Sequence, residues 1–211
     1  MKWKTINPIN KLCKMFIKWN ICKVENHEKH GFSFAQEKWS EMIKSKDFIA
    51  QAGGWDLNNK NEACIISFWE NKESLDNFMK NTHDTIFNNT KQVETYSSIE
   101  VKYFDSFIEN RDNYELLKEG IYGAKFLNVK TLKASKDEFE SFKKTKINHS
   151  TVIIRKELKE TESNNFEYLI STFCKRFENN NSHLQPNINQ ILERQILLVD
   201  SWKIVNVLNY N

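Results

Sequence analysis

Apolar and polar residues alternate with a period of two in short segments of this chain, and these segments are separated by stretches with helical spacing. In the first half, four segments are predicted to be strands: residues 16–24, 48–55, 63–69 and 96–104. Helical spacing covers residues 25–45 and resumes after Asn71, which is a suitable helix cap. The predicted order is β-α-β-β-α-β, the ferredoxin-like unit, in which both helices lie on one face of an antiparallel sheet.

The same pattern begins again after residue 123. Strands are predicted at residues 124–131, 150–157, 166–173 and 195–205. Helices are predicted at residues 135–146 and within residues 177–194, where the helix is interrupted or begins near Pro186. The two halves match at an offset of roughly 100 residues, which indicates an internal repeat. We therefore divide the chain into four parts: an N-terminal extension (1–14), repeat 1 (15–108), a charged linker (109–123) and repeat 2 (124–211).

Several predicted strands are apolar on both faces, as in residues 64–66 and 196–199. A sheet that carries helices on one side needs only one apolar face, so the second face must also be covered. The simplest cover is the sheet of the other repeat. The fold predicted is thus α+β, with two tandem ferredoxin-like repeats whose sheets pack as an intramolecular barrel of the dimeric α+β type. A second chain would serve equally well, so we expect a monomeric pseudo-dimer or a weak homodimer.

Composition and charge exclude several classes of protein. The net charge of +3 is spread along 211 residues without a basic stripe, so we expect no nucleic-acid partner. No apolar run is long enough to span a membrane, and no apolar segment typical of a signal peptide follows the basic N-terminus. The four cysteines are far apart and are predicted to be buried free thiols, which suits a cytoplasmic location.

The residues with chemical potential gather in residues 48–84. Gln51 precedes a Gly53-Gly54-Trp55 run at a strand end, so Gln51 could orient a ligand while Trp55 stacks on it. The alternative is a plain bulge beside a core tryptophan, because paired glycines also permit close backbone approach. His83 is the candidate catalytic residue, and the competing interpretation is a solvated histidine at a helix end.

Aromatic residues complete the candidate site. The tryptophans are more typical of core packing, but as a set they could line a pocket for a small apolar or aromatic molecule. The predicted ligand-binding residues are Trp19, Gln36, Trp39, Gln51, Trp55, Trp69 and His83. We predict no metal, because His27 and His30 have no evident partner ligands, and the sequence contains no recognised cofactor motif.

Four runs carry a family resemblance: FSFAQEKW, FIAQAGGW, IISFW and FMKNTHD. With them the chain resembles the uncharacterised YdbC-like bacterial proteins of the dimeric α+β barrel superfamily, which also includes antibiotic-biosynthesis monooxygenases and haem-degrading enzymes. The resemblance implies the fold and brings no activity. Phe78 and Asn88 stand where the haem-degrading members have Trp and His, which argues against haem chemistry.

Two functions remain open from the sequence. One is a cofactor-independent, monooxygenase-like enzyme with an aromatic-lined pocket in repeat 1. The other is a binding or interaction module without catalysis, in which the pocket is vestigial. A cavity of roughly 300 Å³ or more, with polar groups converging in it, would favour a functional pocket.

Overall fold

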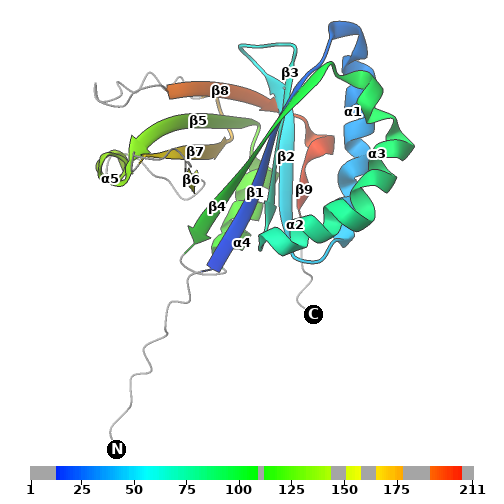
Figure 1. Ribbon diagram of the computed structural model, residues 1–211. Helices are drawn as coiled ribbons and strands as arrows, with labels where there is room; N and C mark the ends of the chain where they lie inside the picture. The colour runs from blue at the N-terminus through cyan, green and yellow to red at the C-terminus, as the bar shows by residue number, and fades with distance from the viewer. Residues whose placement is uncertain (1–12, 109–111, 144–150, 158–164, 178–190, 206–211) are drawn as a thin grey trace, which may run out of the picture.

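The structure of the protein, a computed structural model, describes residues 13–108, 112–143, 151–157, 165–177 and 191–205. Repeat 1 has the predicted β-α-β-β-α-β order. Its elements are β1 (Cys13–Lys23), α1 (Lys29–Glu37), β2 (Phe48–Asp56), β3 (Glu62–Trp69), α2 (Lys72–Phe78), α3 (Asp84–Thr90) and β4 (Ser98–Ile108). The strands lie in the order β2-β3-β1-β4, all neighbours antiparallel. Figure 1 shows α1, α2 and α3 together on one face of this sheet.

Repeat 2 follows the same strand order. It contains β5 (Phe126–Ser135), α5 (Lys136–Lys143), β6 (Thr151–Glu157), β7 (Asn165–Cys174), β8 (Ile191–Leu198) and the short β9 (Ile204–Val205). The prediction of a helix reaching residue 194 is wrong at its end, because Ile191 to Arg194 pair with β5 as part of β8. The rest of that predicted helix, residues 178–190, lies outside the described residues.

The two sheets join edge to edge at both sides. At one side β4 meets β6 through the pair Asp105 and Arg155. At the other side β2 pairs with β8, with Gly54 opposite Leu198. Because β2 also pairs with β3, eight strands follow one another round a ring. The predicted intramolecular barrel of two ferredoxin-like repeats is therefore confirmed.

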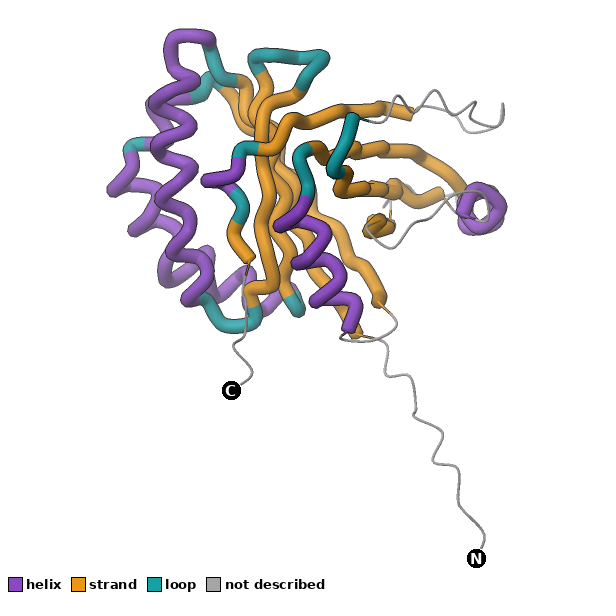
Figure 2. The backbone as a smooth tube through the Cα atoms, turned by 180° about the vertical axis from the view of Figure 1, so that it is seen from behind, coloured by secondary structure: helices purple, strands orange, loops and turns teal. Residues whose placement is uncertain are grey.

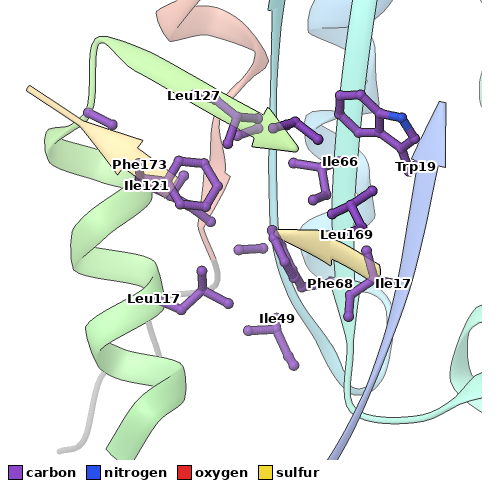
Figure 3. Close-up of a cluster of buried hydrophobic side chains, with 14 of the residues drawn as sticks. Ile17, Trp19, Ile49, Ile66, Phe68, Leu117, Ile121, Leu127, Leu169 and Phe173 are labelled. Carbon is purple, nitrogen blue, oxygen red and sulfur yellow. The ribbon is translucent and has the colours of Figure 1, made fainter. Parts of the chain in front are cut away.

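The inside of the barrel is filled by apolar side chains of both repeats, as Figure 3 shows. Ile17, Trp19 and Ile66 come from repeat 1, and Leu127 and Leu169 from repeat 2. All five are at most 2% exposed. This shared interior explains why strands of both repeats are apolar on two faces.

The stretch expected to be a linker contains helix α4 (Asp112–Gly123). Tyr114, Leu117 and Ile121 recur at helical spacing, and all three are buried in the barrel core. In Figure 2 this helix lies between the sheet of repeat 1 and the strands of repeat 2. The connection between the repeats thus contributes to the core.

An ion pair ties the two repeats at the β2–β8 seam. Nη1 of Arg194 lies 2.6 Å from Oδ2 of buried Asp56 and also contacts the carboxylate of Glu62. Oδ1 of Asp56 accepts the backbone N–H groups of Asn58 and Asn59 at 2.8 and 3.1 Å. One carboxylate therefore holds both the β2–β3 hairpin and the strand of the other repeat.

Of the two glycines of β2, Gly54 serves this seam. A Cβ atom on Gly54 would lie 2.0 Å from the backbone oxygen of Leu197, and one on Gly53 would lie 3.0 Å from the backbone oxygen of Cys64. The register shift of β2 lies earlier, between Phe48 and Ala50. Gly54 therefore permits β8 to approach, whereas Gly53 faces β3 and Trp202. The plain bulge that was the alternative for this motif is not found at the glycines.

Replacing Gly54 by Ala should destabilise the protein by roughly 3 kcal/mol, because backbone atoms of β8 would have to move away from β2. Gly31→Ala is the matched control. Its Cβ would meet only the Thr95 Cγ2 atom at 3.4 Å and a Glu28 carboxylate oxygen at 3.6 Å, inside helix α1. There alanine should be neutral or stabilising by up to about 1 kcal/mol. Urea unfolding followed by tryptophan fluorescence measures both, and equal free energies of unfolding for the two variants would contradict this account of the seam.

Candidate functional site

A cavity of about 240 Å³ lies between the outer face of the repeat-1 sheet and the helices that cover it. Its floor is formed by side chains of β1, β2 and β3, and its roof by side chains of the helical segments. Within the part of the chain that the structure describes, every lining residue falls between Lys18 and Tyr103, so the described cavity is built by repeat 1.

The floor is a row of polar side chains that runs across three strands. Gln51 of β2 lies opposite Ser67 of β3, and Ser67 lies opposite Lys18 of β1. Asn20 and Cys22 follow Lys18 at alternate positions of β1, so they point to the same face. The intervening residues of this strand point the other way, into the barrel. One strand therefore carries an apolar core on one face and a polar cavity floor on the other.

The roof is aromatic. The ring of His83 lies against three other rings, with centroid distances of 5.2 Å to Trp39, 5.5 Å to Phe87 and 6.1 Å to Phe78. The His83 side chain is 18% exposed, and its Nδ1 atom lies 2.9 Å from Oδ1 of Asp84. His83 is therefore held in place by rings on several sides and by one carboxylate.

A π-helical turn, Met79–His83, brings this histidine to the cavity. In an α-helix residues five apart point in clearly different directions, whereas a π-helix places residue i+5 about one turn after residue i. Phe78 and His83 are five apart, and both line the cavity. Such turns occur often at functional sites, and this one lies between the α-helical segments α2 and α3.

A buried chain of amide groups fixes one wall. The indole Nε1 of Trp39 donates to Oε1 of Gln92 at 2.7 Å, and Nε2 of Gln92 donates to Oε1 of Gln36 at 3.0 Å. Gln36 and Gln92 are 4% and 5% exposed. Because buried amides with satisfied hydrogen bonds have one preferred orientation, this wall is rigid.

The floor, in contrast, contains polar atoms without protein partners. Within the described part of the chain, the buried Nε2 atom of Gln51 donates no hydrogen bond and the buried Oδ1 atom of Asn20 accepts none. The lining residues that the structure describes include no Asp or Glu. The Nζ atom of Lys18 contacts the sulfur of Met79 at 3.6 Å. Burial lowers the pKa of Lys18, an effect that Cys22 partly opposes.

The thiol of Cys22 is unsuited to nucleophilic chemistry. Burial raises its pKa to about 12, although the nearby Lys18 acts in the opposite direction. At neutral pH the group therefore remains a thiol, and only a thiolate is a strong nucleophile. Cys22, Cys64 and Cys174 are buried free thiols, as predicted.

The structure brings together four of the seven predicted ligand-binding residues. Gln36, Trp39, Gln51 and His83 all line the cavity.

The other three residues do not line the cavity. Trp19 points into the barrel with Ile17, because alternate residues of β1 share a face. Trp55 packs with Phe32 and Trp202 near the seam. Trp69 lies under the helices, where its Nε1 atom donates to Oγ of Ser67 at 3.2 Å. The expectation of one pocket lined by all these tryptophans is therefore wrong in its geometry.

Sequence reasoning missed Lys18, Asn20, Ser67 and Gln92, which all line the cavity. The sequence of β1 already indicated these residues. Both faces of the sheet were expected to be covered, yet this strand has polar Lys18 and Asn20 at alternate positions, on one face. Polar residues on a covered face need partners, so this pattern indicates a polar cavity.

The described residues contain neither a metal-binding cluster nor a membrane-spanning helix. No three His, Cys, Asp or Glu side chains among them lie close enough together to hold a metal ion. None of the described helices is long and apolar enough to cross a membrane.

Comparison with known proteins matches repeat 1 to a family. The family described as a domain of unknown function, DUF4937, matches residues 16–104. Over 93 residues the chain is 40% identical to the uncharacterised protein YdbC of Bacillus subtilis, an alignment that covers 43% of this chain and 78% of that protein. The chain belongs to the YdbC-like family. The described residues that line the cavity lie inside the segment matched to this family.

Solved structures resemble the whole barrel. A candidate monooxygenase from Fusobacterium nucleatum has a TM-score of 0.57 and 10% identity, and covers 88% of this chain and 93% of its own. A candidate monooxygenase from Lactobacillus acidophilus has a TM-score of 0.54 and 11% identity, and covers 92% of this chain and 97% of its own. At such low sequence identity, these similarities show only that this YdbC-like chain shares the fold of those proteins.

Replacing Lys18 by Met should raise the free energy of unfolding at pH 7 by on the order of 1 kcal/mol, because an ammonium without a carboxylate partner leaves the covered face. The pKa of Lys18 is lower in the folded protein than its unfolded value of 10.5. The charged Lys18 therefore destabilises the wild-type protein fully at pH values below the folded pKa, and this effect fades as the pH rises from the folded pKa towards 10.5. The stability gap between the two proteins should therefore narrow above neutral pH.

Exposed Lys23 at the end of the same strand provides the control, since Lys23→Met removes the same charge in solvent. Denaturant titrations at several pH values measure the gap. A Lys18→Met protein that is less stable than wild type at pH 7 would show that the ammonium is satisfied within the fold.

Proposed function

We propose that the repeat-1 cavity binds a small aromatic molecule, with His83 as a polar group beside it. The observation that carries the proposal is the pairing of an aromatic roof with unsatisfied polar atoms on the floor. Buried polar atoms are normally paired, so those of Gln51 and Asn20 are best explained as ligand contacts. Rings prefer to pack against rings at the distances found around His83.

The size of the cavity limits the ligand. At about 240 Å³ it lies just under the range of roughly 300–1,000 Å³ usual for sites of drug-sized molecules. A ligand of one or two fused rings suits this space.

The fold supports a catalytic use of the same site. Solved structures with this barrel include candidate monooxygenases, and the neutral form of His83 can act as a base. A proton on Nδ1 facing Asp84 leaves Nε2 free to accept one. Neutral His83 could then take the hydroxyl proton of an electron-rich phenol, and the phenolate could react with O₂ without a cofactor.

For 1-naphthol the reaction is balanced without any other oxidant. The carbon opposite the hydroxyl loses its hydrogen and gains one oxygen atom of O₂ as a carbonyl. The second oxygen atom leaves as water with that hydrogen and the hydroxyl proton, and the product is 1,4-naphthoquinone. The substrate supplies all four electrons.

A binding module without catalysis is the second candidate function. The exposure of the Asp84 side chain, 82%, favours this function, because a solvent-exposed carboxylate interacts only weakly with a histidine.

Titration with 1-naphthol, read by tryptophan fluorescence, tests the site. Phe87→Ala removes the ring stacked on His83 and should weaken binding by up to about tenfold. Trp55→Phe is the control, because Trp55 lies outside the cavity and should leave the affinity unchanged. If Trp55→Phe weakened binding and Phe87→Ala did not, the site would lie elsewhere.

An oxygen electrode distinguishes the two functions with the same compound. An enzyme would consume one O₂ for each 1-naphthol, and His83→Gln should lower that rate by roughly 100-fold or more while affinity stays nearly unchanged. Saturated wild-type protein without oxygen uptake would support the binding module for this ligand and contradict catalysis by oxygenation.

A further inference from the structure

We propose that the ligand of the repeat-1 cavity is an aromatic anion whose charged oxygen is bound by Lys18 and Gln51, and that a hydroxyl beside this oxygen donates to Asn20. The class that meets these requirements is that of aromatic hydroxy acids and their phenolates. The inference rests on the proposed function, since it names the chemistry of the molecule that the cavity would bind.

The charge of the cavity favours an anion. Lys18 contributes an ammonium to the floor, and no lining residue in the described ranges is an Asp or Glu. The sulfur of Met79, 3.6 Å from Nζ, is a weak acceptor that cannot neutralise this charge. A charged group on a covered face needs an opposite charge, and here the ligand can bring it.

The unpaired atoms specify two further contacts. Gln51 is 3% exposed, and its Nε2 atom is a buried donor without an acceptor. The Oδ1 atom of Asn20 is a buried acceptor without a donor. A single ligand oxygen that bears negative charge can accept from both Lys18 and Gln51, while Asn20 requires an N–H or O–H group of the ligand.

The strand register brings these three groups to one region. Gln51 and Lys18 flank Ser67 in one row across the sheet, so their Cα atoms are roughly 10 Å apart and their long side chains can reach a common point. Asn20 lies roughly 7 Å further along β1. An anionic group and an adjacent hydroxyl on one ring match this spacing.

The side of the cavity along β4, the strand next to β1, is apolar and reaches the surface. Ile99, Val101 and Tyr103 of β4 line the cavity and are 44%, 37% and 41% exposed. They provide an apolar entrance through which a ring can pass. The bound molecule would therefore lie with its charged end between Lys18 and Gln51 and its apolar edge towards β4.

Isothermal titration of the full chain with three related probes at pH 7 tests the charge: 2-naphthoate, naphthalene-2-carboxamide and 3-hydroxy-2-naphthoate. The carboxylate should bind at least tenfold more tightly than its neutral amide, and the hydroxy acid more tightly still. Lys18→Met should reduce the preference for carboxylate over amide to about one, with amide affinity within threefold of wild type. Lys18→Arg should retain the preference, and Lys23→Met should match wild type.

Two further arms identify the other groups. Asn20→Leu should remove the advantage of 3-hydroxy-2-naphthoate over 2-naphthoate. With 2-naphthol, binding that strengthens as the pH rises through the phenol pKa would identify phenolate as the preferred source of the charge.

The outcomes separate this inference from the proposed function. If the amide binds wild-type protein as tightly as the carboxylate, or if Lys18→Met keeps the preference, the anion assignment is overturned while aromatic binding stands. If none of the aromatic probes binds, the proposed function fails and the anion assignment fails with it. Thermal unfolding of each variant without ligand verifies that the fold is retained.

Discussion

The pairing of β2 with β8 is the contact on which the rest of the structure depends. It joins the sheets of the two repeats at the side where Gly54 lets the backbone of Leu197 approach, and the Arg194–Asp56 pair reinforces it. With the ring of strands closed, the apolar inner faces of both sheets are removed from water. Closure within one chain provides the cover that a second subunit would otherwise supply.

Closure also determines where a ligand site can lie. The inside of the barrel is packed with apolar side chains and with α4, so the cavity lies on the outer face of the repeat-1 sheet, under the helices. Strand β1 serves both sides, because Ile17 and Trp19 point inwards while Lys18 and Asn20 point to the cavity. An ammonium and an unpaired amide oxygen on a covered face lower stability, and such a cost is typical of groups retained for function.

The sequence predicted the repeated β-α-β-β-α-β order and the barrel, because period-two alternation and strands apolar on both faces reflect burial directly. It failed where local pattern competes with tertiary pairing. The segment after residue 109 appeared to be a charged linker, yet Leu117 and Ile121 form the buried side of a helix. Residues 191–194 were assigned to a helix, although pairing with β5 makes them part of β8.

The candidate site was predicted in part, for equally physical reasons. Gln51 and His83 were found because unusual polar residues stand out beside strand ends and apolar stripes. The π-helical turn that directs His83 to the cavity leaves no simple periodic signal. Alternation alone does not tell which face of a strand meets the barrel core, so Trp19 was placed in the pocket and Lys18 was overlooked.

A crystal structure of the full chain soaked with 3-hydroxy-2-naphthoate tests the central claim most directly, namely that the repeat-1 cavity is a site for an aromatic anion. The account predicts the ring between the helices and the outer face of the repeat-1 sheet, beside His83. It also predicts a carboxylate oxygen within hydrogen-bond distance of Lys18 Nζ. A ligand found inside the barrel, or one whose carboxylate faces solvent at the β4 entrance, would contradict it.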